Sequence, residues 1–348
     1  MHIIQAEDLK KLTLKILIAK GADHENADRV AHSLVLSDLS GVMTHGVFQL
    51  TRYLEDVSRG EISPSAKPEI VNETSSTALV RGNWTYGPVS AMYAMEIAMD
   101  KADKEGFSIV ALVEAHHIGR LGEYAEVAVH RGLFSQIWAS GQGVDDPAAV
   151  PYGGSKPILH TNPIAIGAPS GQEQPMVIDY ATTVVSGSKV LLAHQENKKI
   201  DKGWIVDSEG RDTTDPSLLL DGGASHLPFG GHKGYGIMLA DELFGRVFSG
   251  ADSYSNTEKG GLLKHQGVTF IVFKSDLFQS KSDFNSTSDD LLSKVRSVPP
   301  APGFDEVMVP GDIEAKALSE RTKNGIPLSD SLWDVLLDLA DGLDISVE

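Results

Sequence analysis

The chain has 348 residues, of which 41% are hydrophobic and 22% charged, so we expect a folded protein with a sizeable core and two domains. The formal net charge of −18 excludes an overall basic surface for nucleic acid or an anionic membrane, and we expect neither as a partner. Cysteine is absent, which excludes disulfides, thiolate catalysis and cysteine-ligated zinc; H-E-x-x-H is also absent, so we expect no metal. The first residues, MHIIQAEDLKKL, lack the features of a signal peptide, and no apolar run reaches the roughly 18–20 residues that span a bilayer, so we expect a cytoplasmic location.

The first part of the chain is predicted to be helical. Hydrophobic residues recur at helical spacing in three stretches, about 9–21, 23–38 and 44–59. Gly60 is a good stop signal for the third. In that third stretch His45, Gln49 and Arg52 fall on one helical face, so we expect the three side chains to look into one site. A lone histidine at a helix start also has a plain structural explanation.

The centre of the chain alternates strands and helices, which is α/β organisation. Short β-rich segments occur at 67–71, 77–82, 107–113 and 134–140. Helical patterns occur at 87–106 and 119–132, and again near the end at 288–298 and 329–343. Residues 151–171 are rich in Gly and Pro and predict ordered loops. We therefore expect a discontinuous helical domain from residues 1–72 and 280–348, and a central domain from residues 73–279.

The usual nucleotide fingerprints are missing, since no G-x-G-x-x-G follows a strand and no G-x-x-x-x-G-K-[ST] occurs. A Rossmann dehydrogenase and a P-loop enzyme are therefore disfavoured. The stretch PFGGHKGYG (228–236) instead places His232 and Lys233 among four glycines where an apolar helix begins. A helix N-terminus beside a lysine is typical of phosphate binding, and close helix packing through the glycines is the alternative.

Two further segments carry candidate side chains. Asp179 ends the apolar run VIDYATT, where a carboxylate suits ribose or amide recognition or the orientation of an imidazole. The alternative is an N-cap for a helix over 184–194. His116 and His117 stand between a strand and a helix, and adjacent side chains of an extended segment point in opposite directions. At most one of the pair therefore faces a given cleft, and a pair of plain loop histidines is the alternative.

Taken together, the motifs resemble a known family. THG (44–46), HHIG (116–119), GEYAE (122–126), VPYGG (150–154), TNP (161–163), VIDYATT (177–183), GGHKGYG (230–236) and VPGD (309–312) occur in this order. The set covers almost the whole chain and resembles the malate/L-lactate dehydrogenase family that has no Rossmann fold. That family also contains ureidoglycolate and sulfolactate dehydrogenases, 2,3-diketogulonate reductase and piperideine-2-carboxylate reductase.

The resemblance implies a fold, a reaction and partners. The fold would be α/β and non-Rossmann, with a central sheet domain that binds NAD(P), a helical domain from both chain ends, and a homodimer. The reaction would be hydride transfer between nicotinamide and C2 of a small 2-hydroxy or 2-keto acid such as malate, lactate or ureidoglycolate. NAD and NADP both remain open as the cofactor, and we favour NAD. Reduction of a cyclic imine is one alternative, and a family member that binds without catalysing is another.

The resemblance also implies roles for single residues. His45 matches the proton-transferring histidine, and His117 matches the histidine that has this role in the ureidoglycolate branch; we rank His45 first. Residues expected near the cofactor are Asp179, Tyr180, Ala181, Thr182, His232, Lys233, Gly311 and Asp312. Thr161 and Asn162 are expected beside the substrate. An imidazole with a pKa near 6.5–7 can transfer the proton in both directions, and a neighbouring carboxylate would hold its tautomer and raise that pKa.

One position departs from the family. Four residues after the histidine the family usually has an arginine that grips the substrate carboxylate, whereas this chain has Gln49. A neutral amide in its place loses about 1.5–3 kcal/mol of carboxylate binding unless another group compensates. Arg52 and Arg120 are the candidates for that role. Otherwise the substrate group near Gln49 is uncharged.

Overall fold

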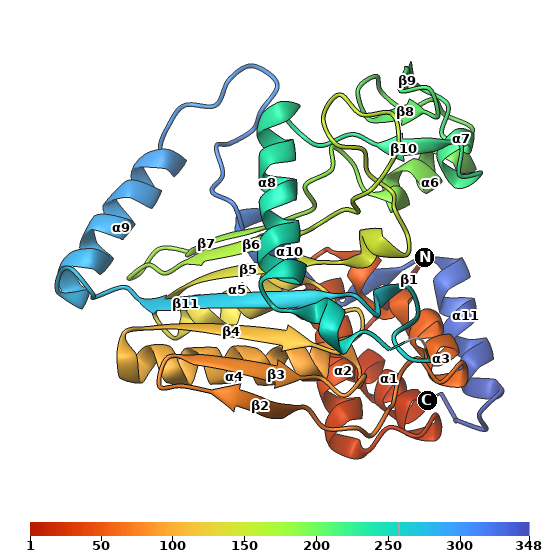
Figure 1. Cartoon of the computed structure of the whole chain (residues 1–348), viewed down its shortest axis with the longest axis horizontal. Helices are drawn as coiled ribbons and strands as arrows, with labels where there is room; N and C mark the ends of the chain where they lie inside the picture. The colour runs from red at the N-terminus through yellow and green to blue at the C-terminus, as the bar shows by residue number, and fades with distance from the viewer. Residues whose placement is uncertain (257, 348) are drawn as a thin grey trace.

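The computed structural model describes residues 1–256 and 258–347. Its centre is a seven-stranded sheet with the order β2-β3-β4-β11-β5-β6-β7 (Figure 1). These strands are β2 Glu69–Glu73, β3 Thr77–Arg81, β4 Phe107–Val113, β5 Leu133–Ser140, β6 Ile164–Ala168, β7 Met176–Tyr180 and β11 Gly267–Lys274. Within this sheet β3 and β4 run parallel and the other neighbours antiparallel. The predicted α/β fold without a parallel Rossmann sheet is therefore confirmed.

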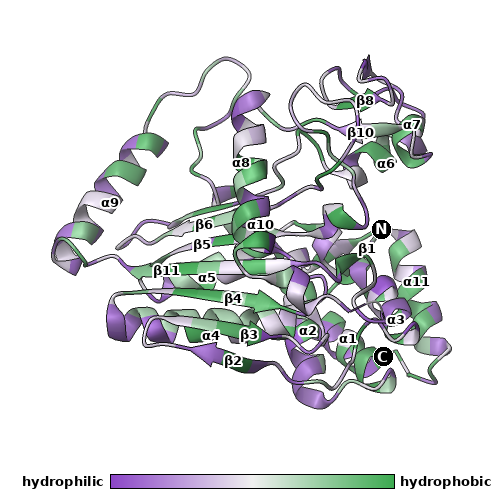
Figure 2. Ribbon diagram, in the orientation of Figure 1, coloured by the Kyte–Doolittle hydropathy of each residue, from purple (hydrophilic) through white to green (hydrophobic). Residues whose placement is uncertain are grey.

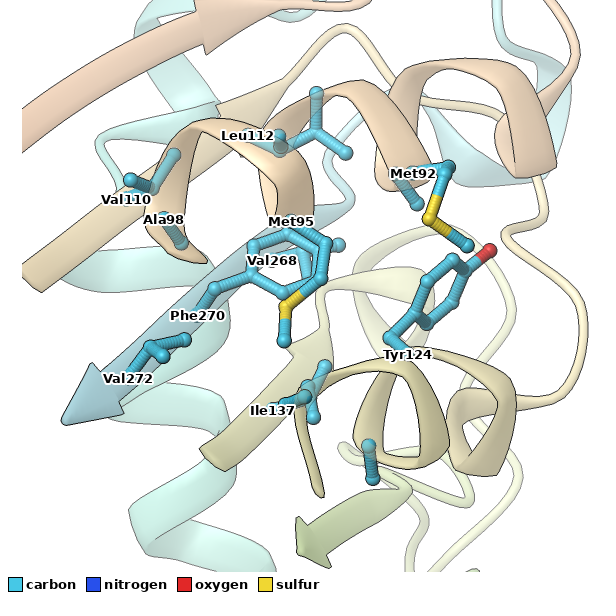
Figure 3. Packing of buried hydrophobic residues seen from close by; sticks show 14 of the residues in the cluster. Met92, Met95, Ala98, Val110, Leu112, Tyr124, Ile137, Val268, Phe270 and Val272 are labelled. Carbon is cyan, nitrogen blue, oxygen red and sulfur yellow. The ribbon is translucent and has the colours of Figure 1, made fainter. Parts of the chain in front are cut away.

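Helices α4 (Gly87–Glu105) and α5 (Leu121–His130) cover one face of this sheet. Side chains alternate along a strand, so every second residue of β4 and β11, including Val110, Leu112 and Phe270, points into the layer between sheet and helices. Figure 3 shows this core, in which Met95 of α4 packs in one cluster with Phe270. Burying one such side chain contributes about 1.5–3 kcal/mol, which fixes the sheet against α4 and α5.

The two ends of the chain build a second core. Strand β1 (His2–Ile4) pairs antiparallel with β12 (Ile326–Leu328), and α1 (Ala6–Ala19), α2 (His24–Leu39), α3 (Leu50–Ser58) and α11 (Asp330–Asp341) pack around them. Helix α9 (Lys281–Arg296) lies apart from this core, beside the turn between β6 and β7, where backbone N–H groups of Gly171 and Gln172 donate to Asp289. The domain boundary near residue 280 stays a prediction.

A small unit carries its own core and lies at the upper right of Figure 1. It comprises α6 (Gly187–Gln195), β8 (Ile205–Asp207), β9 (Asp212–Thr213), α7 (Ser217–Leu220) and β10 (Ala224–His226). Helix α8 (His232–Glu242) then crosses the second face of the large sheet and continues as a π-helical turn over Leu243–Val247. Short 3-10 turns occur at Met43–His45, Val47–Gln49, Gln142–Val144, Ala251–Tyr254 and Gly261–Leu263.

Helix α10 (Asp312–Asn324) has no counterpart among the predicted helices, and it connects the two cores. At its start the carbonyl of Pro310 accepts from the N–H of Val177 in β7, 3.0 Å away. Near its end Arg321 donates to the backbone carbonyl of Asp38 in α2, at 2.6 Å. Among the described residues, no helix combines the length and apolar composition that crossing a membrane requires.

Candidate active site

His45 lies in a broken turn and not in a continuous helix. The predicted helix over 44–59 is α-helical from Leu50 on, whereas residues 43–49 form two 3-10 turns that meet at Gly46. The backbone of Gly46 is extended, with φ −84° and ψ −154°. The expectation that His45, Gln49 and Arg52 share one face of a single helix is therefore wrong for His45. Gln49 instead turns back, and its Nε2 donates to the carbonyl of Thr44 at 2.7 Å.

The side chains of His45 and His117 come together. Their rings are stacked, with centroids 5.6 Å apart and planes 18° apart. The hydroxyl of Thr44 lies 3.1 Å from Nδ1 of His45. The hydroxyl of Tyr53, a buried residue of α3, lies 2.8 Å from Nδ1 of His117. Each ring therefore has a hydroxyl at Nδ1, which leaves its Nε2 for other partners.

His116 points away from this pair, as the alternation of an extended segment predicts. Its Nε2 lies 3.2 Å from Oδ2 of Asp56, and both side chains are buried. Ligand atoms of Asp56, Glu61 and His116 lie within 4.8 Å of one another. Arg59 pairs with both carboxylates, so this cluster is an ion-pair network, and we retain the expectation of no metal.

Arg120 lies at the start of α5 and is 1% exposed. Its Nη1 donates to Glu126 at 2.9 Å, and Nη2 pairs with the second oxygen of the same carboxylate. This forked ion pair fixes the guanidinium in place. The charge of Arg120 acts on both His45 and Asp179. Arg120 is therefore a fixed, buried positive charge near His45 and Asp179, already paired with Glu126.

Asp179 ends β7, as predicted, and faces the start of α5. Its Oδ2 accepts from the backbone N–H of Gly122 at 2.7 Å. A side chain at Gly122 would bring a Cβ within 2.8 Å of Arg120 Nη1 and 3.0 Å of Asp179 Oδ2, so glycine is needed for this close approach. The alternative of an N-cap for the next helix is wrong, because Ser186 caps α6.

The charge states of the cleft differ from the expectation. Burial, followed by the charge of Arg120, lowers the pKa of His45 to about 4. Burial, followed by His45 and Arg52, lowers the pKa of His117 well below its ordinary value. The expected pKa near 6.5–7 is therefore wrong for these rings in the free protein, because both rings are buried and because a cation, not a carboxylate, adjoins His45. Crowding by the surrounding protein raises the pKa of Asp179 to about 6, although the residue as a whole is exposed.

The TNP turn is held by α8 and by the segment after β7. Asn162 is buried with a left-handed φ of 39°, and its Nδ2 donates to Glu242 of α8 at 2.9 Å. The N–H of Thr182 donates to the carbonyl of Thr161 at 2.8 Å. The side chain of Asn162 thus fastens the turn to α8, while Thr161 fastens it to the segment after β7.

A cavity of about 710 Å³ adjoins His116, and Arg52, Gln142, Asp146 and Lys264 are among its lining residues. Lys264 is paired with Asp145, whereas Arg52 makes one loose contact of 3.7 Å with Asp56. The charge of Arg52 also acts on His117 and on Asp146. Arg52 therefore links this cavity to the histidine pair.

The predicted cofactor segments lie side by side. The carbonyl of Thr182 accepts from the N–H of Phe229 at 3.0 Å, so Tyr180–Thr182 runs next to the glycine-rich turn. Tyr180, His232 and Lys233 are exposed, and Ala181 is half-buried. Gly311 packs against Val177 of β7. The carboxylate of Asp312 is bound to Arg296 and to the N–H of Val309, so its side chain holds the α10 start together.

Several residues that contact the predicted site segments are not among the predicted site residues, namely Tyr53, Asp38 and His160. Tyr53 and Asp38 come from helices whose pattern signals only a core face. His160 lies 3.6 Å from Asp146 and 3.1 Å, through Nδ1, from the Thr161 hydroxyl. A polar residue next to the TNP motif is the signal that points to His160, whereas Tyr53 and Asp38 carry no such signal.

Comparisons with known proteins identify the family of the chain. A family model described as malate/L-lactate dehydrogenase matches residues 4–337. The chain is 35% identical to a malate/(S)-sulfolactate dehydrogenase from Methanothermus fervidus, over 99% of both chains. It is similar to the solved structure of sulfolactate dehydrogenase from Methanocaldococcus jannaschii, with a TM-score of 0.89, 32% identity and coverage of 99% and 98%. It is also similar to malate dehydrogenase from Entamoeba histolytica, with a TM-score of 0.91, 27% identity and 99% coverage of both chains.

Proposed function

Because the chain belongs to the malate/L-lactate dehydrogenase family and is therefore an oxidoreductase, we propose that it transfers a hydride between NAD(P) and C2 of a small 2-hydroxy or 2-keto acid. NAD is the favoured cofactor and the cytoplasm the expected compartment. The observation that carries the proposal is the stacking of His45 on His117 beside Arg120, whose charge acts on both His45 and Asp179. These groups offer proton transfer and a fixed positive charge at the same place.

The residues beside the cleft fit a dinucleotide. Gly230 and Gly231 have φ of 58° and 64° and lead directly into α8, with Lys233 exposed at its first turn. Lys233 makes no ion pair with any described residue. His232, Lys233 and the helix N-terminus would hold the phosphates, and Tyr180–Thr182 would line the nicotinamide end with Gly311 nearby. The cofactor, when bound, supplies the hydride donor or acceptor.

A histidine moves the proton that accompanies the hydride. In oxidation, Nε2 of a neutral imidazole accepts the proton of the C2 hydroxyl; in reduction the imidazolium returns it to the carbonyl oxygen. The lowered pKa of both rings keeps them neutral at pH 7, which suits the base role. We rank His45 first and keep His117 as the alternative. The positive charge of Arg120 stabilises negative charge that develops on the substrate oxygen.

The substrate carboxylate binds at Arg52 in this proposal. Arg120 is buried and already satisfies both oxygens of Glu126, whereas the Arg52 side chain is 41% exposed at the cavity. Arg52 therefore has donors free for a second carboxylate, to which a guanidinium binds in a fork. Thr161 and Asn162 belong to the TNP turn next to His160, and they would lie beside the substrate.

The test is a panel of acids followed at the nicotinamide absorbance band. Pyruvate, oxaloacetate, sulfopyruvate and piperideine-2-carboxylate are offered with NADH and with NADPH, and lactate, malate and ureidoglycolate with the oxidised cofactors. We expect turnover of at least one 2-keto acid, lost in His45→Gln and retained in His24→Gln, which changes an exposed histidine far from the cleft. Turnover of the imine alone, or cofactor binding without turnover of any acid, would overturn the proposal.

We also propose a homodimer as the working form. Large apolar side chains stand exposed along the second half of α8 and the π-helical turn, among them Leu239, Leu243, Val247 and Phe248, and Figure 2 shows α8 changing from hydrophilic colouring at its upper end to hydrophobic colouring further along. An apolar strip of this kind is typical of an interface between subunits. Light scattering after size exclusion should give twice the chain mass. Phe248→Asp should yield monomers, whereas Leu220→Asp, on the separate small unit, should not; a monomeric wild type contradicts the proposal.

A further inference from the structure

The loop that carries His45 rests on a buried carboxyl group. Asp38, near the end of α2, is 0% exposed. Its Oδ2 accepts from the backbone N–H of Val47 at 2.8 Å. Its Oδ1 has no hydrogen-bond partner among the described residues. A buried carboxyl group with one free oxygen is unfavourable unless the surroundings hold it there, so its position needs an explanation.

That explanation lies at Gly46. A Cβ added to Gly46 would stand 1.9 Å from Oδ1, 2.2 Å from Cγ and 2.4 Å from Oδ2 of Asp38. The carboxyl group therefore occupies the space of the missing side chain. Gly46 has a negative φ of −84°, which any residue adopts, so the glycine is required by this contact and not by its backbone conformation.

The contact between Asp38 and Gly46 lies in the middle of the loop that carries His45, residues 43–49. Gly46 separates the 3-10 turn of His45 from the 3-10 turn of Gln49, and the Gln49 amide closes the loop on the Thr44 carbonyl. Asp38 holds the N–H that follows Gly46. It therefore fixes the angle between the two turns, and with it the direction in which the His45 ring leaves the backbone.

Asp38 is itself held from behind. Its backbone carbonyl accepts from Arg321 of α10 at 2.6 Å and from the N–H of Gly41 at 3.1 Å. Ala317 of α10 lies 3.3 Å from the place of a Cβ at Gly41. The contacts that hold Asp38 thus extend to α10, and the segment at the start of α10 contacts β7.

We propose that Asp38 is a positioning residue for proton transfer, because its carboxyl group fills the space beside Gly46, binds the Val47 N–H and so aims His45 at His117 and the substrate. This inference rests on the proposed function for its kinetic consequences but not for its structural ones. Burial raises the pKa of Asp38 to about 7, and a neutral acid or amide therefore fits the same place.

The test uses four variants: Asp38→Asn, Asp38→Ala, Gly46→Ala and the double variant Asp38→Ala/Gly46→Ala. Asp38→Asn keeps an acceptor for the Val47 N–H and should stay within about threefold of wild-type kcat. Asp38→Ala should lower kcat about 10- to 100-fold, since a misplacement on the order of 1 Å has this effect, while the KM for the nicotinamide cofactor changes little. Gly46→Ala should lower kcat by at least as much in wild type, but by about threefold or less in the Asp38→Ala background, where the Cβ has room.

Two results would overturn the proposal: an equal cost of Gly46→Ala in both backgrounds, or Asp38→Asn as poor as Asp38→Ala. Circular dichroism and thermal melting check the fold of each variant. NMR of the His45 ring, assigned with His45→Gln, gives a readout that does not need turnover. The His45 signals should move in Asp38→Ala and stay near the wild-type shifts in Asp38→Asn, even if no acid of the panel is turned over; unmoved signals in Asp38→Ala contradict the proposal.

Discussion

The imidazole rings of His45 and His117 lie stacked with their centroids 5.6 Å apart. At this distance one charged ring raises the cost of charging the other, and His45 is among the groups that lower the pKa of His117. The pair therefore takes up a single proton more readily than two. The hydroxyl groups of Thr44 and Tyr53 lie at the two Nδ1 atoms, so both rings keep Nε2 for other partners.

Tyr53→Phe separates the roles of the two rings. The change removes the hydroxyl 2.8 Å from Nδ1 of His117 and leaves His45 with its Thr44 partner. If His45 is the base, as we propose, kcat should fall by about threefold or less, because only a neighbouring ring loses its anchor. His45→Gln should lower kcat about 10²- to 10⁴-fold. Steady-state kinetics measure both; a larger loss in Tyr53→Phe than in His45→Gln would assign the proton to His117.

The pH dependence should be displaced to low pH. The pKa of His45 in the folded protein is about 4, against about 6.5 in an unfolded chain. For oxidation the base must be neutral, so kcat/KM, which reports the free enzyme, should stay level from about pH 8 to about pH 5 and fall below that. A fall already centred near pH 6.5 would contradict the lowered pKa.

The same shift affects stability. The unfolded chain binds a proton at His45 at higher pH than the folded chain, so the contribution of neutral His45 is present above about pH 6.5 and is lost as the pH falls toward about 4. Urea unfolding at about pH 7 and pH 5 should show a smaller loss of stability in His45→Gln than in wild type. An equal loss of stability in wild type and in His45→Gln would contradict this prediction.

Gln49→Arg should change the preference among acids. A guanidinium beside the His45 loop offers a charged fork to a second carboxylate, so the ratio of kcat/KM for oxaloacetate to that for pyruvate should rise about tenfold. The control is Gln172→Arg, which adds the same charge at an exposed position away from the cleft. A ratio that rises equally in both variants would reflect net charge and not the site.

Asp241 should respond to substitution with a gain in stability. It is 0% exposed, and neither carboxyl oxygen has a hydrogen-bond partner among the described residues. Burial, followed by the charge of Glu242, raises its pKa well above the ordinary value. The stability that neutral Asp241 contributes is therefore fully present below about pH 4, the pKa of an aspartate in an unfolded chain. It is lost as the pH rises toward the higher pKa of the folded protein.

Asp241→Leu removes this pH-dependent loss and should raise the free energy of unfolding by about 1–3 kcal/mol near pH 8, and by less near pH 5. Asp338→Leu, at an exposed position of α11, serves as the matched control and should change little. Urea denaturation at the two pH values decides the matter, and a larger gain at the lower pH would refute the assignment.

Local sequence patterns predict the helices and strands better than the contacts between them. The alternation rule foresaw that His116 and His117 diverge, and the apolar run before Asp179 foresaw a strand end. The helix expected from residue 44 fails up to Gln49 because Asp38, from another helix, presses on Gly46, and no local propensity contains that contact. The ion pair of Arg120 with Glu126 likewise joins the residue before α5 to a residue within it. Because Arg120 is paired in this way, we propose Arg52 as the arginine that binds the substrate. Tertiary contacts of this kind set the charge states of the cleft.

The contact between Asp38 and Gly46 constrains the order in which this sequence can change. Any side chain at position 46 collides with the carboxyl group while position 38 is occupied by an acid of this size. A smaller residue at position 38, if it comes first, leaves a void and a Val47 N–H without its acceptor, and His45 is then held less firmly. If Asp38 positions His45 as we propose, a lineage reaches a larger residue at position 46 only through an intermediate with impaired proton transfer, and selection on activity then holds the two residues together as a pair.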